Sequence, residues 1–467
     1  MTRKILKPLL LATVAGLGLM TSTLAVSAET LADALVSAYR NSHLLEQNRA
    51  TLRAADEDVA QAVSALRPVL QWTADYGYSA TDSTIATYRA QGKSYDRLTA
   101  YTSLVAQMTL YDFGRTRLAI DMKKEAVLAT REALRSVEQS VLLSAISAYT
   151  SVKSTAEQVS INENSVHVYG EDLKAARDRF EVGEVTKTDV SQAEAAEAAA
   201  RAALAAARGN YQIAREAYKA SIGHYPDKLS PLPKAPTLPK SLDTARETAL
   251  RNHPSIKQAQ HTVSMSELGV SAAAAERLPT IDGSAGFTNY EGGNKATNVG
   301  VGLTQTLYAG GKLSSAHRQA IASRDEAKAA LSEAGVEIAD SVAQAWAQIG
   351  VYQAQITAYD EQISAAKIAY EGVKEEATLG ARTTLDVLDA EQTLLDARAS
   401  RITAEADLQV GYYQLLSAMG LLTVEDLKLG IPTYDPAAYY NAVENAPLTS
   451  VRGKSLDRVM QAIGKKP

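Results

Sequence analysis

The chain has 467 residues, a formal net charge of -5 with 22% charged residues, and no cysteine. The lack of cysteine excludes disulfides and thiolate metal sites, and the mixed charges argue against a nucleic-acid-binding protein. Tyrosine is common (22 Tyr against 3 Phe and 2 Trp), and its ring suits surfaces that are wet at one end and apolar at the other, including membrane interfaces.

Residues 1–28 have the features of an export signal. A basic start at residues 3–7 is followed by the apolar run Leu9–Met20 and by a small-residue cleavage site ending at Ala28. We therefore expect the mature chain to begin near Glu29, outside the cytoplasm. No later stretch comes near the ~18 apolar residues of a membrane-spanning helix, so a membrane-spanning form would have to be a closed β-barrel.

The rest of the chain repeats itself once. The segment Leu110-Tyr-Asp-Phe-Gly-Arg115 recurs as Leu307-Tyr-Ala-Gly-Gly-Lys312, and at the same offset Asp189 corresponds to Asp386. The sequence therefore predicts a mainly α protein with β-structure, divided into repeat 1 (29–223), a Pro-rich linker (224–242), repeat 2 (243–420) and a tail (421–467).

Each repeat is predicted to contain three parts in the same order. A helix ends before Pro68 or Pro279, a β-hairpin follows, and a long helical hairpin without internal Pro completes the repeat. The expected ranges are a helix at 31–66 and 243–277, a β-hairpin at 69–111 and 280–308, and a long helical hairpin at 115–222 and 312–419.

The predicted hairpins alternate apolar residues with small or polar residues, which is typical of half-buried strands. Leu70, Trp72 and Tyr76 alternate with polar neighbours in repeat 1, and Val299 to Leu307 follow the same pattern in repeat 2. The tip around Ser83 to Ser94 is expected to be a polar loop. Ordinary surface hairpins on a soluble core are one explanation, but strands of ~10 residues are long enough to cross a bilayer at a tilt.

The long helices are predicted to be rods of ~65 residues, or about 100 Å at 1.5 Å per residue. The alanine-rich stretch Ser191–Arg208 should pack along its length against similar helices. Five prolines between Pro226 and Pro239 predict an extended linker over the surface. The end of the tail, 454–467, is expected to be weakly helical or disordered.

Two hairpins supply four strands, and four strands cannot close a barrel. The chain must therefore oligomerise if it spans a membrane. The helical rods would then continue the barrel as a tube.

The repeated plan, the two Leu-Tyr motifs and the segment Arg382-Thr-Thr-Leu-Asp-Val-Leu-Asp389 resemble the TolC family of outer-membrane efflux and secretion channels. The resemblance implies a homotrimer in the outer membrane, with a twelve-stranded β-barrel contacting lipid, a periplasmic α-helical barrel, and an equatorial belt formed by the linker and the tail. It implies the exit channel of a tripartite efflux pump or a type I secretion system. Its partners would be a periplasmic adaptor and an inner-membrane pump of the RND or ABC type.

Two carboxylates near the start of the last long helix are candidate gate residues. Thr186 and Asp189, like Thr383 and Asp386, have the spacing of a helix-capping box, which is sufficient to explain Asp189 and Asp386. Asp389 corresponds to Gln192 in repeat 1, so helix capping does not explain why a carboxylate is present at this position. In a trimer, the resemblance implies that Asp386 and Asp389 form two cation-selective rings that line the pore, with raised proton affinity. An ordinary solvated helix face is the alternative for Asp389.

Arg382 resembles a gate-locking arginine of this family. The resemblance implies that it pairs with Asp189 and Thr188 on the adjacent hairpin and so holds the tip closed. The family often has a tyrosine in this lock at the position of Ala377. The closed state is therefore expected to be held less firmly, or by other contacts.

The turns between the long helices resemble the adaptor-contacting tip loops of the family. Their glycines also fit left-handed helix ends, which is compatible with that contact. The residues concerned are Val182, Gly183, Glu184 and Val185 in repeat 1, and Leu379, Gly380 and Ala381, followed by Arg382, in repeat 2.

An enzyme is not predicted, and neither a catalytic residue, a cofactor nor a metal site is expected. The six histidines show no metal-ligand spacing, and His253 and His261 are expected to be solvated. A periplasmic adaptor or a soluble coiled-coil scaffold is the alternative function, because such proteins also contain long alanine-rich hairpins.

Overall fold

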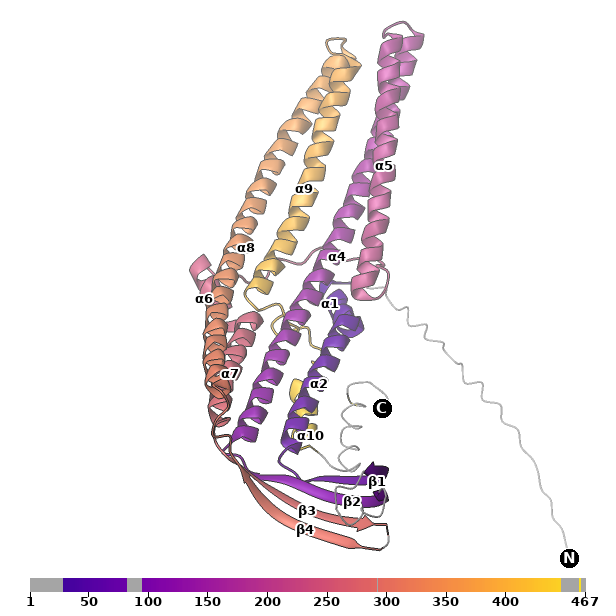
Figure 1. Ribbon diagram of the computed structural model, residues 1–467. Coiled ribbons are helices and arrows are strands. Elements are labelled where there is room, and N and C mark those ends of the chain that lie inside the picture. The colour runs from indigo at the N-terminus through magenta and orange to yellow at the C-terminus, as the bar shows by residue number, and fades with distance from the viewer. Residues whose placement is uncertain (1–27, 82–94, 292, 447–461, 463–467) are drawn as a thin grey trace, which may run out of the picture.

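The computed structural model describes residues 28–81, 95–291, 293–446 and 462. The predicted signal segment, the polar tip at Ser83–Ser94 and most of the predicted end of the tail lie outside these residues. The described chain is an elongated molecule with a β-sheet at one end and the tips of two helical hairpins at the other (Figure 1).

The two repeats are visible as the same order of elements, with helices of nearly equal length and with longer strands in repeat 1. Repeat 1 contains α1 (Leu31–Asn41), α2 (His43–Ser64), β1 (Val69–Thr81), β2 (Tyr95–Tyr111), α4 (Arg115–Glu181) and α5 (Lys187–Ile222). Repeat 2 contains α6 (Leu242–Asn252), α7 (Pro254–Ala275), β3 (Thr280–Tyr290), β4 (Lys295–Thr304), α8 (Lys312–Thr378) and α9 (Thr384–Ala418). The short helix α10 (Pro436–Val443) follows.

The first helix of each repeat is broken in two, which differs from the continuous helices expected at 31–66 and 243–277. The break lies at Ser42, whose side chain accepts a hydrogen bond from Leu45 N, and at His253, whose side chain accepts one from Ser255 N. Pro254 begins α7, and a proline disfavours helical backbone in the residue before it. Each break therefore ends one helix and caps the next.

The strands form one antiparallel sheet in the order β1-β2-β3-β4. Its register aligns Trp72 with Leu104 and Leu104 with Phe287, so these apolar side chains share one face, and all three are exposed. The opposite face is more polar, and Ser103 and Thr288 form a hydroxyl hydrogen bond of 3.1 Å there. β4 ends at Thr304, so Leu307 lies beyond the strand that was predicted to include it.

The junctions from strand to long helix use left-handed backbone. Gly114 and Gly311 occupy matched positions with φ of 86° and 89°. In repeat 1 the Asp112 carboxylate accepts hydrogen bonds from Gly114 N (3.1 Å) and Thr116 N (2.7 Å), which caps α4. Arg115 Nη2 donates to the carbonyls of Ala275 and Leu278, at 3.0 Å each, so the start of α4 is tied to the end of α7.

The main hydrophobic core lies around the middle of the long helices, where α1, α6, the linker and the first part of the tail pack on them. Residues 224–241 of the linker contain no helix, and Leu242 already begins α6. The leucines Leu229, Leu232 and Leu238 pack against this core, so the linker does not simply run over the surface. The Tyr149 hydroxyl donates to the carbonyls of Glu29 (3.0 Å) and Ser230 (2.9 Å), and so fixes the N-terminal segment and the linker on α4.

Within the described residues, no helix has an apolar stretch long enough to cross a membrane.

Candidate functional site

The tips of the two helical hairpins have the same backbone geometry. Gly183 and Gly380 follow α4 and α8 with φ of 81° and 78°. Glu184 N donates to Arg179 O at 2.9 Å, and Ala381 N donates to Glu376 O at 3.0 Å, which closes each helix end. Val182 is 71% exposed and Leu379 is 81% exposed, so each tip carries an exposed apolar side chain.

The predicted capping boxes are confirmed in both repeats. Asp189 Oδ2 accepts hydrogen bonds from Thr186 N (2.8 Å) and Thr186 Oγ1 (2.7 Å), and Asp386 Oδ2 accepts the equivalent bonds from Thr383, both at 2.9 Å. The side-chain bond from Thr186 is the main cause that lowers the pKa of Asp189, and the backbone bond from Thr383 that of Asp386. Within one chain the cap therefore opposes the raised proton affinity expected for a ring at Asp386.

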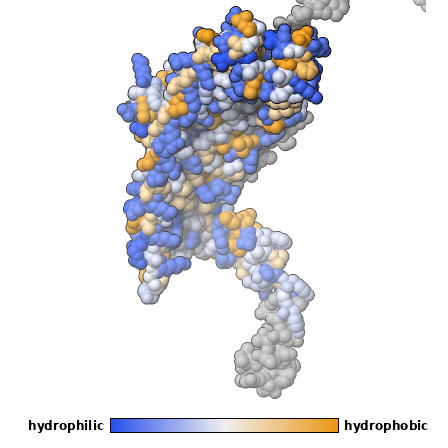
Figure 2. Space-filling model, turned by 90° about the horizontal axis from the view of Figure 1, so that it is seen from above, coloured by the Kyte–Doolittle hydropathy of each residue, from blue (hydrophilic) through white to orange (hydrophobic). Residues whose placement is uncertain are grey.

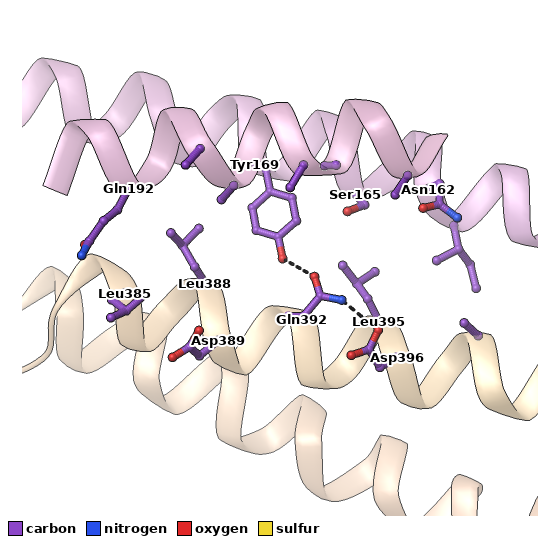
Figure 3. Close-up of a pocket in the computed structure, with 17 residues that line it drawn as sticks. Asn162, Ser165, Tyr169, Gln192, Leu385, Leu388, Asp389, Gln392, Leu395 and Asp396 are labelled. Carbon is purple, nitrogen blue, oxygen red and sulfur yellow. Dashed lines mark hydrogen bonds between the residues drawn. The ribbon is translucent and has the colours of Figure 1, made fainter. Parts of the chain in front are cut away.

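Asp389 lies in a different environment from Asp386. Its side chain is exposed and lines a groove of about 570 Å³ between α4, α5 and α9 (Figure 3). Gln192, its counterpart in repeat 1, lines the same groove from α5. Deeper in the groove the Tyr169 hydroxyl donates to Gln392 Oε1 at 3.3 Å. The two matched residues, Asp389 and Gln192, therefore line the same groove, and only Asp389 is a carboxylate.

Arg382 pairs within its own hairpin in the single chain. Its Nε donates to Glu376 Oε2 at 2.8 Å, with both side chains about half exposed. Asp189 and Arg382 line one cavity of about 690 Å³ between the two tips, whereas Thr188 is exposed and does not line it. The predicted bonds from Arg382 to Asp189 and Thr188 stay a prediction.

Arg179 makes a contact between the hairpins that was not predicted from the sequence. Its Nη1 donates to the carbonyl of Ala377 at 3.5 Å, so the end of α4 touches the end of α8 beside the position where the family often has a tyrosine. The repeat contained a signal for this residue, because Arg179 corresponds to Glu376 and the charges at these matched positions are opposite.

His253 and His261 are not solvated as expected. His253 caps α7, and burial lowers its pKa. His261 Nδ1 lies 2.8 Å from Glu125 Oε2, and both side chains are largely buried. In the described part of the chain, His, Asp and Glu side chains nowhere form a group of three that could hold a metal ion.

Comparisons with known proteins agree with this architecture. The family model "Outer membrane efflux protein" matches residues 34–224 and 245–421, which correspond to the two repeats. The chain is 34% identical to the outer membrane efflux protein BepC of Brucella suis (95% of this chain, 96% of BepC). It is 26% identical to the outer membrane protein TolC of Escherichia coli (85% and 84%).

A solved structure, the CmeC outer membrane channel of Campylobacter jejuni, matches the fold with a TM-score of 0.74 at 17% identity, over 90% of each chain. The predicted fold class and the resemblance to the TolC family are thereby confirmed, and the channel is favoured over the adaptor or scaffold. The protein is an outer-membrane channel protein and not an enzyme. The chain belongs to the outer membrane efflux protein family.

Proposed function

We propose that three copies of this chain form an exit channel in the outer membrane, with its periplasmic gate at the tips of α4/α5 and α8/α9. The channel would be the outer component of a tripartite efflux pump or a type I secretion system. An adaptor and an inner-membrane pump of the RND or ABC type would deliver the substrate to it. Relatives in the outer membrane efflux family support this role.

The observation that carries the proposal is the four-stranded sheet. In the described chain β1 and β4 are edge strands with one neighbour each, and long unpaired edges must be covered. The apolar face contains Trp72 (68% exposed) on β1 and Val301 (70% exposed) on β4 at its edges. Pairing β4 of one copy with β1 of the next would satisfy both edges and turn this apolar face to lipid.

The long helices support an assembly as well. Although α8 contains 67 residues, only Ala327, Val342, Ile349 and Ala366 are buried within the chain. A helix of this length that is exposed along most of its surface fits the wall of a tube shared between copies. The surface seen from the tips is mostly hydrophilic with scattered hydrophobic patches (Figure 2), as expected for a tube in water.

The gate is assigned to Asp386 and Asp389 as cation-selective rings, and to Arg382, Asp189 and Thr188 as locking contacts. The shared cavity of Arg382 and Asp189 supports a lock at this place, because both residues line the same space between the tips. The adaptor would contact the two tip loops, Val182 to Val185 and Leu379 to Ala381. Exposed ion pairs contribute only about 1 kcal/mol or less each, so docking could break them.

The mass of the detergent-solubilised protein tests the assembly. Light scattering should give three chains per particle, and planar bilayers should show discrete channels. Pull-down of the native particle should recover a periplasmic adaptor and an inner-membrane pump. A monomer that stays in solution without detergent would contradict the proposal.

A further inference from the structure

Two buried carboxyl groups meet where α4 and α9 pack together, and the gate proposed above does not use them. Glu391 on α9 is 4% exposed, and its carboxyl group lies beside that of the half-buried Asp172 on α4. Asp172 Oδ2 and Glu391 Oε2 are also buried and have no hydrogen-bond partner. A hydrogen bond between two carboxyl groups requires a proton on one of them.

The internal repeat shows that this pair is a departure from a simpler arrangement. Glu391 corresponds to Glu194, and Lys374 corresponds to Arg177. In repeat 1, Arg177 Nη2 and Glu194 Oε1 form an ion pair of 2.7 Å inside one hairpin, with both side chains about half exposed. In repeat 2, Asp172 from the other hairpin reaches Glu391, and Lys374 Nζ donates to the Tyr370 hydroxyl at 3.1 Å. Glu194 in repeat 1 therefore has its partner within its own hairpin, whereas Glu391 in repeat 2 has a neighbour from the other hairpin.

The surroundings favour one shared proton. Burial, followed by the charge of Asp172, raises the pKa of Glu391 to about 7, and burial is also the main cause that raises the pKa of Asp172. Lys374 lowers both pKa values, because its positive charge favours the carboxylates. The charged and titratable groups around the pair are Tyr169 and Glu171 on α4, Tyr370 and Lys374 on α8, and Asp396 and Arg398 on α9.

The charge balance differs between the two protonation states. With one proton, the single negative charge of the pair is balanced by Lys374. Without it, two carboxylates face each other, and because Glu391 is only 4% exposed, little water can screen their repulsion. Because Asp172 and Glu391 belong to different hairpins, this repulsion acts to separate them.

We propose that Asp172 and Glu391 form a proton-dependent clamp, which holds the two helical hairpins together near the gate and releases them when the last shared proton leaves. The clamp rests on the gate proposed above. It would supply a link between the two hairpins near the proposed lock. Since the pKa of Glu391 is raised, the clamp is present below about pH 7 and is lost as the pH rises above it.

Spin labels on the tips test the clamp without relying on conduction. The chain contains no cysteine, so Glu184→Cys with Ala381→Cys introduces two labelling sites, both at exposed positions. Labelled chains are diluted with unlabelled chains, so that distances within one chain dominate. The distance between labels should increase with a midpoint near pH 7. In Glu391→Gln the amide can donate to Asp172 at any pH, so the increase should disappear, and Asp172→Asn should act alike.

Glu194→Gln is the matched control, because it changes the same position in repeat 1 and should keep the pH-dependent increase. Two results would overturn the clamp. One is a label distance that does not change with pH. The other is a pH-dependent increase that is as large in Glu391→Gln and Asp172→Asn as in the labelled chain without these substitutions. Single-channel conductance over the same pH range separates the clamp from the gate. A label distance that depends on Glu391 while conductance stays constant would support the clamp and contradict the proposed gate.

Discussion

Asp56 on α2 is a fully buried carboxylic acid outside the gate. Neither of its oxygens has a hydrogen-bond partner in the described chain. Burial raises its pKa to about 7, although the positive charge of Arg131 opposes this rise. The acid is protonated in both states well below pH 4. As the pH rises towards 7, the unfolded state ionises freely while the folded state resists, so stability falls.

Replacing this acid by its neutral isostere should remove the cost. We expect Asp56→Asn to stabilise the protein by up to about 4 kcal/mol above pH 7 and to have little effect near pH 4, measured as thermal unfolding in detergent. Asp58→Asn is the control, since Asp58 is about half exposed and pairs with Lys123 at 2.9 Å. Equal effects of Asp56→Asn at both pH values would show that ionisation at this position does not limit stability.

The acidic residues of the gate should control ion selectivity. The double substitution Asp386→Asn and Asp389→Asn removes both carboxylates, while the asparagine at 386 can still cap α9. We expect reduced cation selectivity and weaker block by divalent ions, measured from reversal potentials in planar bilayers. Asp58→Asn, on α2 and outside the gate, is the control and should leave selectivity intact. Reversal potentials identical to the wild type in the double variant would remove the assignment.

The arginine of the proposed lock should control how far the channel opens. Arg382→Ser removes the pair with Glu376 and any pairing with Asp189, so single-channel conductance should increase. Arg177→Ser breaks an ion pair inside the first hairpin and serves as the comparison. A conductance equal to that of the wild type would place the lock elsewhere, for example at Arg179.

At the scale of elements, two helix-ending glycines of similar geometry differ in their surroundings. Gly380 and Gly420 have φ of 78° and 76°. A Cβ at Gly380 would meet nothing within 4 Å, whereas at Gly420 it would lie 2.7 Å from His253 Cα and 3.0 Å from the backbone of Asn252. The end of α9 thus packs directly on the break between α6 and α7.

This difference predicts unequal costs for the same substitution. Gly380→Ala should cost only the strain of left-handed backbone, about 1 kcal/mol. Gly420→Ala adds a clash with the main chain and should cost roughly 3 kcal/mol or more. Thermal unfolding of the two variants measures the difference directly. Similar melting temperatures would mean that the helix break at His253 adjusts without cost.

The order of the elements could be predicted from the sequence because each pattern in one repeat could be checked at the matched position in the other repeat. A glycine or a Thr-x-x-Asp pattern that recurs at matched positions has the same local cause twice, and the local geometry of Gly183 and Gly380 is indeed the same. The helix breaks were missed although Pro254 signals one of them. At Ser42 the break depends on a side-chain cap without proline, which is a weaker signal.

Contacts between hairpins could not be predicted in this way. Asp172 meets Glu391 because α4 packs on α9 with a particular rotation, and Arg179 meets Ala377 where the end of α4 touches the end of α8. Alanine-rich helices carry little periodic bulk, so the sequence does not indicate which face of one helix meets the other. The candidate gate was therefore predicted from its capping turns, while the clamp required the packed structure.

At the scale of the whole molecule, the N-terminal segment and the linker are joined on the middle of α4. The Tyr149 hydroxyl is the donor for two carbonyls, one from the N-terminal segment and one from the linker. Tyr149→Phe would leave both without this donor, and we expect a loss of about 1 to 3 kcal/mol in thermal unfolding. Tyr413→Phe is the control in the same core, since burial alone raises the pKa of Tyr413. Equal effects would argue against this joint.

The equal length of α4 and α8, 67 residues each, sets the two tips at one level. In the proposed trimer, the six tip loops would then lie in one ring. Loops with the negative Glu184 would alternate with loops with the positive Arg382. A docking ring of six identical subunits could not bind every loop in the same manner. The subunits of such a docking ring would have to bind in two different orientations, or assemble as three pairs.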